Sequence, residues 1–104
     1  MTLSFFQNLG PCGLDAILAI IDCKPYNLNN DDFFESLDGL KNQKKNSLIF
    51  IYDKETISNR YFPNSTIICT KKKSTEFDKK QKMIIVKDVQ LSLAKISNLF
   101  YRDL

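Results

Sequence analysis

Three short runs of β-branched and aromatic residues constrain the fold of this chain more than any other feature. They cover Leu48 to Tyr52, Ser65 to Thr70 ("STIICT") and Met83 to Val86 ("MIIV"), and polar residues bound each of them. Runs of this length and composition are typical of strands in a sheet. We therefore predict three strands in the second half of the chain.

Two apolar stripes with helical spacing lie on either side of these strands. The first consists of Leu14, Ile17, Leu18 and Ile21. The second consists of Val89, Leu93, Ile96 and Phe100, with Leu99 at its margin. Lys24-Pro25 is expected to end the first helix, and Asp88 is expected to be the N-cap of the second.

Three other segments are less clearly patterned. Residues 31–40 ("DDFFESLDGL") fit either a helix or a strand, residues 54–64 suggest a helical turn and a loop, and Leu3 to Leu9 are compatible with a short helical turn. Strands interleaved with helices indicate an α/β fold. A chain of 104 residues is long enough for one modest core. We predict a single small α/β domain over residues 1–104, with a mixed β-sheet and flanking helices.

The residue inventory argues against several kinds of chemistry. The chain has no histidine, which excludes a Cys–His nucleophile and a mixed zinc site. Cys12, Cys23 and Cys69 match no metal-binding or redox spacing, so we interpret them as small buried hydrophobic residues in a reducing compartment. The glycines form no phosphate-binding loop. We predict no catalytic residue, no metal and no cofactor, and a cytoplasmic location, because no signal peptide or membrane-spanning run is recognisable.

Charge is distributed unevenly along the chain. Residues 1–40 carry one lysine against six carboxylates, a net −5, and residues 41–104 carry fourteen basic residues against six acidic ones, a net +8. Clustered lysines could attract the phosphates of a nucleotide or a nucleic acid, or could simply keep a small protein soluble. We do not expect a nucleic-acid partner, because the aromatic pair beside a base, Tyr61 and Phe62 next to Arg60, is commoner in a loop that packs under its own core. A nucleic-acid or phosphate-surface binder that uses the lysine-rich half stays a third alternative, and it requires Lys71 to Lys73 and Lys79 to Lys82 to share one face.

The strand in "NSLIFIYDKET" ends unusually. Tyr52, Asp53, Lys54 and Glu55 follow its apolar residues, whereas a strand that only fills a core usually ends in a turn of Gly, Asn or Pro. Such an end could hold a ligand.

Several segments together resemble a known family. The runs "SLDGLKNQKKNSLIFIYDKET", "STIICT" and "MIIVKDVQLSLAKISNLFY", and the opening "FFQNLGP", are similar to the N-terminal domain of UDP-3-O-acylglucosamine N-acyltransferase, the LpxD family of lipid A biosynthesis. The resemblance covers nearly the whole chain and implies a strand within residues 31–40. The N-terminal domain of UDP-muramyl-peptide ligases, another uridine-handling module, fits less well at the last strand-to-helix junction.

The resemblance implies a substrate-binding site for the uridine of a UDP-acylglucosamine, a UDP-sugar. In the family a stacking Phe, an Asn amide and a Tyr hold the uracil, and they fall on Phe50, Asp53 and Thr56. Only the Phe is kept, and Tyr52 could replace the missing Tyr because it shares a strand face with Phe50. The family's N-P-Y triplet is also changed, at residues 88–90. We expect the ring of Phe50 to be partly exposed beside Asp53.

The transferase half of the family is not recognisable in this sequence. In the family, catalysis uses a histidine base in a β-helix of hexapeptide repeats and takes the acyl group from an acyl-carrier protein. The chain has neither the repeats nor a histidine. From the resemblance we expect it to be either the N-terminal part of a member or a shortened relative. We expect a monomer that performs no acyl transfer by itself. The alternative is a non-enzymatic interaction module that kept the fold and lost the nucleotide pocket.

Overall fold

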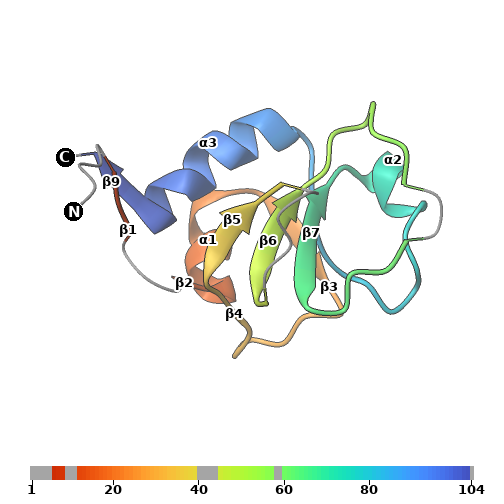
Figure 1. Cartoon of the computed structure of the whole chain (residues 1–104), viewed down its shortest axis with the longest axis horizontal. Coiled ribbons are helices and arrows are strands. Elements are labelled where there is room, and N and C mark those ends of the chain that lie inside the picture. The colour runs from red at the N-terminus through yellow and green to blue at the C-terminus, as the bar shows by residue number, and fades with distance from the viewer. Residues whose placement is uncertain (1–5, 9–11, 40–44, 58–59, 104) are drawn as a thin grey trace.

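A five-stranded mixed sheet forms the centre of the fold (Figure 1). The computed structural model describes residues 6–8, 12–39, 45–57 and 60–103. The strand order is β3-β8-β7-β6-β5, in which β5 to β8 run parallel and β3 pairs antiparallel with β8. The strands are β3 (Cys23–Tyr26), β5 (Ser36–Asp38), β6 (Ser47–Phe50), β7 (Ser65–Cys69) and β8 (Lys82–Val86).

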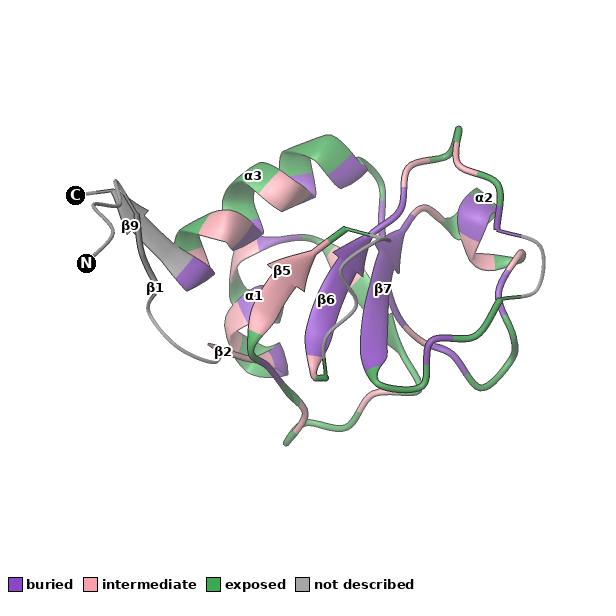
Figure 2. Ribbon diagram, in the orientation of Figure 1, coloured by how far each residue is buried: buried purple, intermediate pink, exposed green. Residues whose placement is uncertain are grey.

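Strands β6 and β7, in the interior of the sheet, are buried along their whole length. Every residue of β6 and β7 is buried, whereas β5 at the sheet edge is half-buried (Figure 2). Continuous apolar composition is typical of parallel strands that are covered on both faces. This burial explains why the sequence runs that we assigned to β6, β7 and β8 show little polar alternation.

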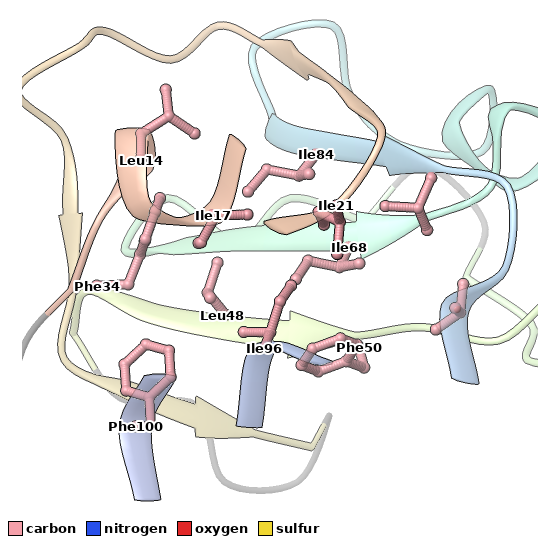
Figure 3. Packing of buried hydrophobic residues seen from close by; sticks show 12 residues of the cluster. Leu14, Ile17, Ile21, Phe34, Leu48, Phe50, Ile68, Ile84, Ile96 and Phe100 are labelled. Atoms are coloured by element: carbon pink, nitrogen blue, oxygen red, sulfur yellow. The ribbon is translucent and has the colours of Figure 1, made fainter. Parts of the chain in front are cut away.

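Helices α1 (Leu14–Ile20) and α3 (Val89–Phe100) pack on one face of the sheet. The predicted N-cap is confirmed, because the backbone N–H of Leu91 donates to Asp88 Oδ1 at 3.0 Å. Val89, Ile96 and Phe100 are buried as predicted, and Leu93 is half-buried. The core of this face includes Leu14, Ile17, Ile21, Phe34, Leu48, Phe50, Ile68, Ile84, Ile96 and Phe100 (Figure 3).

Connecting segments cover the opposite face. Residues 51–64 link β6 to β7, and residues 70–81, which include the short helix α2 (Lys71–Ser74), link β7 to β8. Ile57, Phe62 and Phe77 from these segments are buried. They pack on the strand residues Ile49, Ile67, Cys69 and Met83, together with Ile51 just beyond β6.

Two small antiparallel sheets complete the structure. β2 (Cys12–Gly13) pairs with β4 (Phe33–Phe34) beside α1. β1 (Phe6–Asn8) pairs with β9 (Tyr101–Asp103) at the C-terminal end of α3, which places both at the end of the molecule away from α2 (Figure 1).

The predicted α/β class with a mixed sheet is confirmed, and so is extended structure within residues 31–40, which contain β4 and β5. Other expectations are wrong. Phe6–Asn8 form a strand rather than a helical turn, while the rest of residues 3–9 lies outside the described part. Lys24 and Pro25 lie in β3, because an edge strand tolerates a proline. The described residues of 54–64 form the expected loop, with hydrogen-bonded turns at its two ends and no helix, while residues 58 and 59 lie outside the described part.

Candidate functional site

The carboxyl ends of four parallel strands meet at one edge of the sheet. The chain leaves this edge at Gly39 after β5, at Ile51 after β6, at Thr70 after β7 and at Lys87 after β8. The start of β3 lies here too, because Cys23 pairs with Val86 in the antiparallel ladder. In open α/β sheets, ligands bind outside the carboxyl ends of the strands. We call this the carboxyl edge and take it as the candidate site.

Three adjoining pockets follow the carboxyl edge. The first, the apolar pocket, has a volume of about 330 Å³ and lies between the ends of β5 and β6 and the side of α3. Its lining is mostly apolar or aromatic, with two carboxylates at its margin. The lining residues are Leu37, Asp38, Gly39, Phe50, Tyr52, Glu55 and Leu93.

The second, the edge pocket, has a volume of about 290 Å³ and shares Tyr52 with the apolar pocket. It lies where β6, β7 and β8 end and α3 begins. Its lining residues are Tyr52, Asp53, Thr70, Lys87, Asp88, Val89 and Gln90.

The third, the lysine pocket, is the largest, with a volume of about 570 Å³. It shares Asp53, Thr70 and Lys87 with the edge pocket. Ile85, which pairs with Cys69 in the β7–β8 ladder, contributes to its wall. The lining residues are Asp22, Cys23, Lys24, Asp53, Thr70, Lys71, Lys72, Ile85, Val86 and Lys87.

Phe50 is a core residue, which corrects the expectation of a partly exposed ring. Its side chain is only 7% exposed and belongs to the same cluster as Ile68 and Ile96 (Figure 3). The alternation of β6 turns Leu48 and Phe50 toward α1 and α3. Phe50 therefore contributes only part of a pocket wall. Tyr52, two residues further on the same face, packs at the margin of this core and is half-buried, so it is the more accessible aromatic ring.

Asp53 is exposed and held in place by its neighbours. Thr70 Oγ1 donates to Asp53 Oδ1 at 2.5 Å. The ammonium of Lys73 donates to the backbone oxygen of Asp53 at 3.2 Å and also to that of Glu55. The backbone also forms a turn here, in which the Glu55 N–H donates to the Tyr52 oxygen at 3.0 Å. Thr56 is exposed and lines none of the three pockets, so the structure does not bring it together with the other three predicted residues.

Sequence reasoning missed Lys73, which it treated as one of three surface lysines. Its side chain is 4% exposed, and its ammonium lies 3.0 Å from the carboxylate of Glu76. The one readable signal is Thr70, whose hydroxyl accepts from the Lys73 backbone N–H at 3.3 Å and caps α2. A cap places Lys73 in the first turn of α2. Only the tertiary contact with residues 53–55 shows that Lys73 is buried.

The other lysine groups do not form one surface. Lys71 and Lys72 follow β7 at the carboxyl edge, whereas Lys79 and Lys80 precede β8 at the amino edge of the same parallel pair. Lys82 Nζ lies 3.4 Å from Asp32 Oδ1 and forms an ion pair with it. A continuous track for a nucleic-acid backbone is therefore not formed by these lysines.

The thiols are poor nucleophiles at neutral pH. Desolvation, reinforced by Asp15, raises the pKa of Cys12 to about 11. Desolvation and Asp53 raise the pKa of Cys69 to about 12, against an opposing effect of Lys73. Desolvation and Asp22 also raise the pKa of Cys23. Because the thiolate is the reactive form, we infer no thiol chemistry at this site.

Two further features are absent from the described residues. No group of three or more Cys, Asp or Glu side chains in the described segments is placed to hold a metal ion. Within the same segments, no helix has both the length and the apolar composition needed to cross a bilayer.

Comparisons with family models, with curated proteins and with solved structures give no match to this chain. The likeness to the N-acyltransferase family therefore rests on the sequence runs quoted above.

Proposed function

We propose that the chain is a uridine-binding module that recognises the nucleotide of a UDP-sugar, as the resemblance implies. The observation that supports this most is the apolar pocket at the carboxyl edge, with Tyr52 at its margin and Asp53 beside it. Its volume of about 330 Å³ falls in the range of small-ligand pockets, roughly 300–1,000 Å³.

In this proposal uracil stacks on the ring of Tyr52 rather than on that of Phe50. Leu37 and Leu93 supply the apolar sides of the pocket. Stacking of a base on an aromatic side chain contributes about 1–3 kcal/mol. One such ring gives a dissociation constant in the millimolar range, because binding also has to offset the lost translational and rotational freedom of the ligand.

Asp53 supplies the hydrogen-bond specificity. An ionised carboxylate accepts hydrogen bonds and donates none, so it suits the N3–H of uracil. Asp53 Oδ1 is engaged by Thr70, and no hydrogen bond to Oδ2 is found among the described residues. This second oxygen is the atom that we assign to the base.

The test is a titration of the ¹⁵N-labelled protein with uridine, followed by chemical-shift changes. We expect them at residues 38–39, 50–55 and 90–93, with a millimolar dissociation constant. N3-methyluridine should bind at least threefold more weakly, because it lacks the N3–H. Tyr52→Leu should weaken uridine binding at least fivefold.

Tyr26→Leu is the matched control. Tyr26 is 43% exposed and pairs with Met83, near the opposite edge of the sheet. This variant should bind uridine like the natural chain. If uridine causes no shifts at the carboxyl edge, or if Tyr52→Leu binds it unchanged, the uridine site is refuted and the interaction-module alternative takes its place.

A further inference from the structure

The lysine pocket carries an excess of positive charge. Lys24, Lys71, Lys72 and Lys87 line it against two carboxylates, those of Asp22 and Asp53, a net +2. These four lysines come from three neighbouring segments of the carboxyl edge, which follow or begin β3, β7 and β8. Their convergence is therefore a consequence of the sheet topology and not of adjacency in sequence.

Few of these charges are neutralised within the protein. Lys87 lies 3.9 Å from Asp22, but both side chains are more than 90% exposed, so this pair contributes little. In the described part of the chain, Lys24, Lys71 and Lys72 have no carboxylate within 4.0 Å. Asp53 is shared with the edge pocket and accepts a hydrogen bond from Thr70. Lys24, Lys71 and Lys72 therefore give the lysine pocket positive charge that no ion pair among the described residues neutralises.

We propose that the lysine pocket is an anion site that binds two linked phosphate groups. A pyrophosphate group carries two or more negative charges, which match the excess of two positive charges. The volume of about 570 Å³ accommodates more than a single phosphate. Exposed ammonium groups on flexible stems can converge on phosphate oxygens from several directions.

The order of the pockets also specifies the shape of the ligand, and this step rests on the proposed uridine site. The apolar pocket, the edge pocket and the lysine pocket adjoin one another in that order through shared residues. A ligand that fills all three has a flat apolar ring at one end and a diphosphate at the other. A nucleoside diphosphate has these two groups, joined by its ribose.

The first experiment measures the anion site alone, with inorganic pyrophosphate titrated into the labelled full chain at low salt. We expect shifts at residues 22–24, 70–72 and 85–87. Affinity should fall as salt rises, because the Debye length shrinks from about 30 Å at 0.01 M to about 10 Å at 0.1 M. Lys71→Gln with Lys72→Gln should weaken binding at least tenfold.

The matched control is Lys79→Gln with Lys80→Gln. It removes the same two charges from exposed lysines at the amino edge. Among the described residues, Lys79 and Lys80 form hydrogen bonds only through their backbone atoms. A loss of less than twofold is expected. Equal losses in the two double variants would overturn the proposal, since they would show a response to net charge alone. Tighter binding of an RNA oligonucleotide than of pyrophosphate, with dependence on Lys79 and Lys80, would also overturn it.

A second experiment separates this proposal from the uridine site. UDP should bind at least tenfold more tightly than uridine, and the Lys71 and Lys72 double variant should bind UDP and uridine nearly equally. If uridine binds but UDP binds no more tightly, the anion site is wrong and the uridine site stands. If pyrophosphate binds but uridine does not, the uridine site is wrong and the anion site stands.

Discussion

Substitutions of Gln81 give the sharpest test of how the sheet face opposite to α1 and α3 is stabilised. Its side chain is fully buried just before β8. Its Oε1 accepts from the Phe62 N–H at 2.7 Å, and its Nε2 donates to the oxygens of Phe62, Ser65 and Lys82 at 3.2, 3.0 and 3.1 Å. This one amide therefore contacts four backbone groups near the starts of β7 and β8, and its three acceptors share the two hydrogens of Nε2.

Replacing Gln81 by Leu keeps much of the volume but takes the acceptor from the buried Phe62 N–H and removes one donor from three carbonyl oxygens. Of these, the Phe62 oxygen still accepts from the Ser65 N–H at 3.2 Å. An unsatisfied buried donor or acceptor costs about 1–3 kcal/mol, and the apolar side chain recovers some of the loss, so we expect about 3 kcal/mol. At an m-value near 1.5 kcal/mol/M, the urea midpoint should fall by about 2 M. A fall in the urea midpoint of less than about 0.5 M would show that water or a rearranged loop satisfies these groups, and the stabilising role of the Gln81 amide would be refuted.

Gln81→Glu adds a pH test with a defined sign. Burial and three facing carbonyl oxygens should raise the pKa of the introduced carboxyl above its usual value of about 4.3. The folded state then binds more protons than the unfolded state, so the free energy of unfolding falls as pH rises above about 4.3. Urea titrations at pH 4 and pH 7 should show a much larger deficit at pH 7. Equal deficits would mean that this carboxyl reaches water.

Four other predictions concern a core residue, one thiol, uridine binding and acyl transfer. Phe100→Ala should lower the free energy of unfolding by about 3–5 kcal/mol in urea titration, because Phe100 is fully buried. Burial raises the pKa of Cys69 to about 12 in the folded chain, so the unfolded chain loses this thiol proton at a lower pH. The free energy of unfolding should therefore fall as pH rises from about 9 to 12, and Cys69→Ala should reduce this dependence on pH. Asp53→Asn should weaken uridine binding about threefold, or about 0.7 kcal/mol, because Thr70 holds the Oδ1 position and the amide then presents its N–H groups, which donate, to the N3–H of uracil. The purified chain should show no acyl transfer from an acyl-carrier-protein thioester to a UDP-acylglucosamine, measured by product formation above a buffer blank.

Local signals in the sequence predicted the central elements because local physics determines them. The β-branched runs became β6, β7 and β8, since strands covered on both faces need continuous apolar composition. The apolar stripe from Val89 to Phe100 became α3, and Asp88 caps it as its position before the stripe suggested. In each case a hydrophobic pattern or a cap residue within a few positions was enough to predict the element.

Long-range pairing explains the elements that were missed. Lys24 and Pro25 end a helix in most contexts, and here they lie in an edge strand because Cys23 to Tyr26 pair with β8, about sixty residues later. Lys73 and Gln81 look like surface residues in the sequence. Their burial depends on carbonyl groups of segments far away in the chain, at residues 53–55 and 62–65.

The candidate site follows the same division between local and long-range information. The charged end of "NSLIFIYDKET" marked the end of β6 as a place for a ligand, and the parallel sheet brings that end beside those of β7 and β8. Alternation along β6 buries Phe50 against α3 and leaves Tyr52, one step beyond the strand, at the pocket margin. The lysine pocket could not be predicted from the sequence. Lys24, Lys71 and Lys87 become neighbours only because β3, β8 and β7 lie side by side in the sheet. If both proposals hold, most of the affinity for a nucleotide comes from this lysine pocket, so salt should weaken UDP binding strongly and uridine binding little.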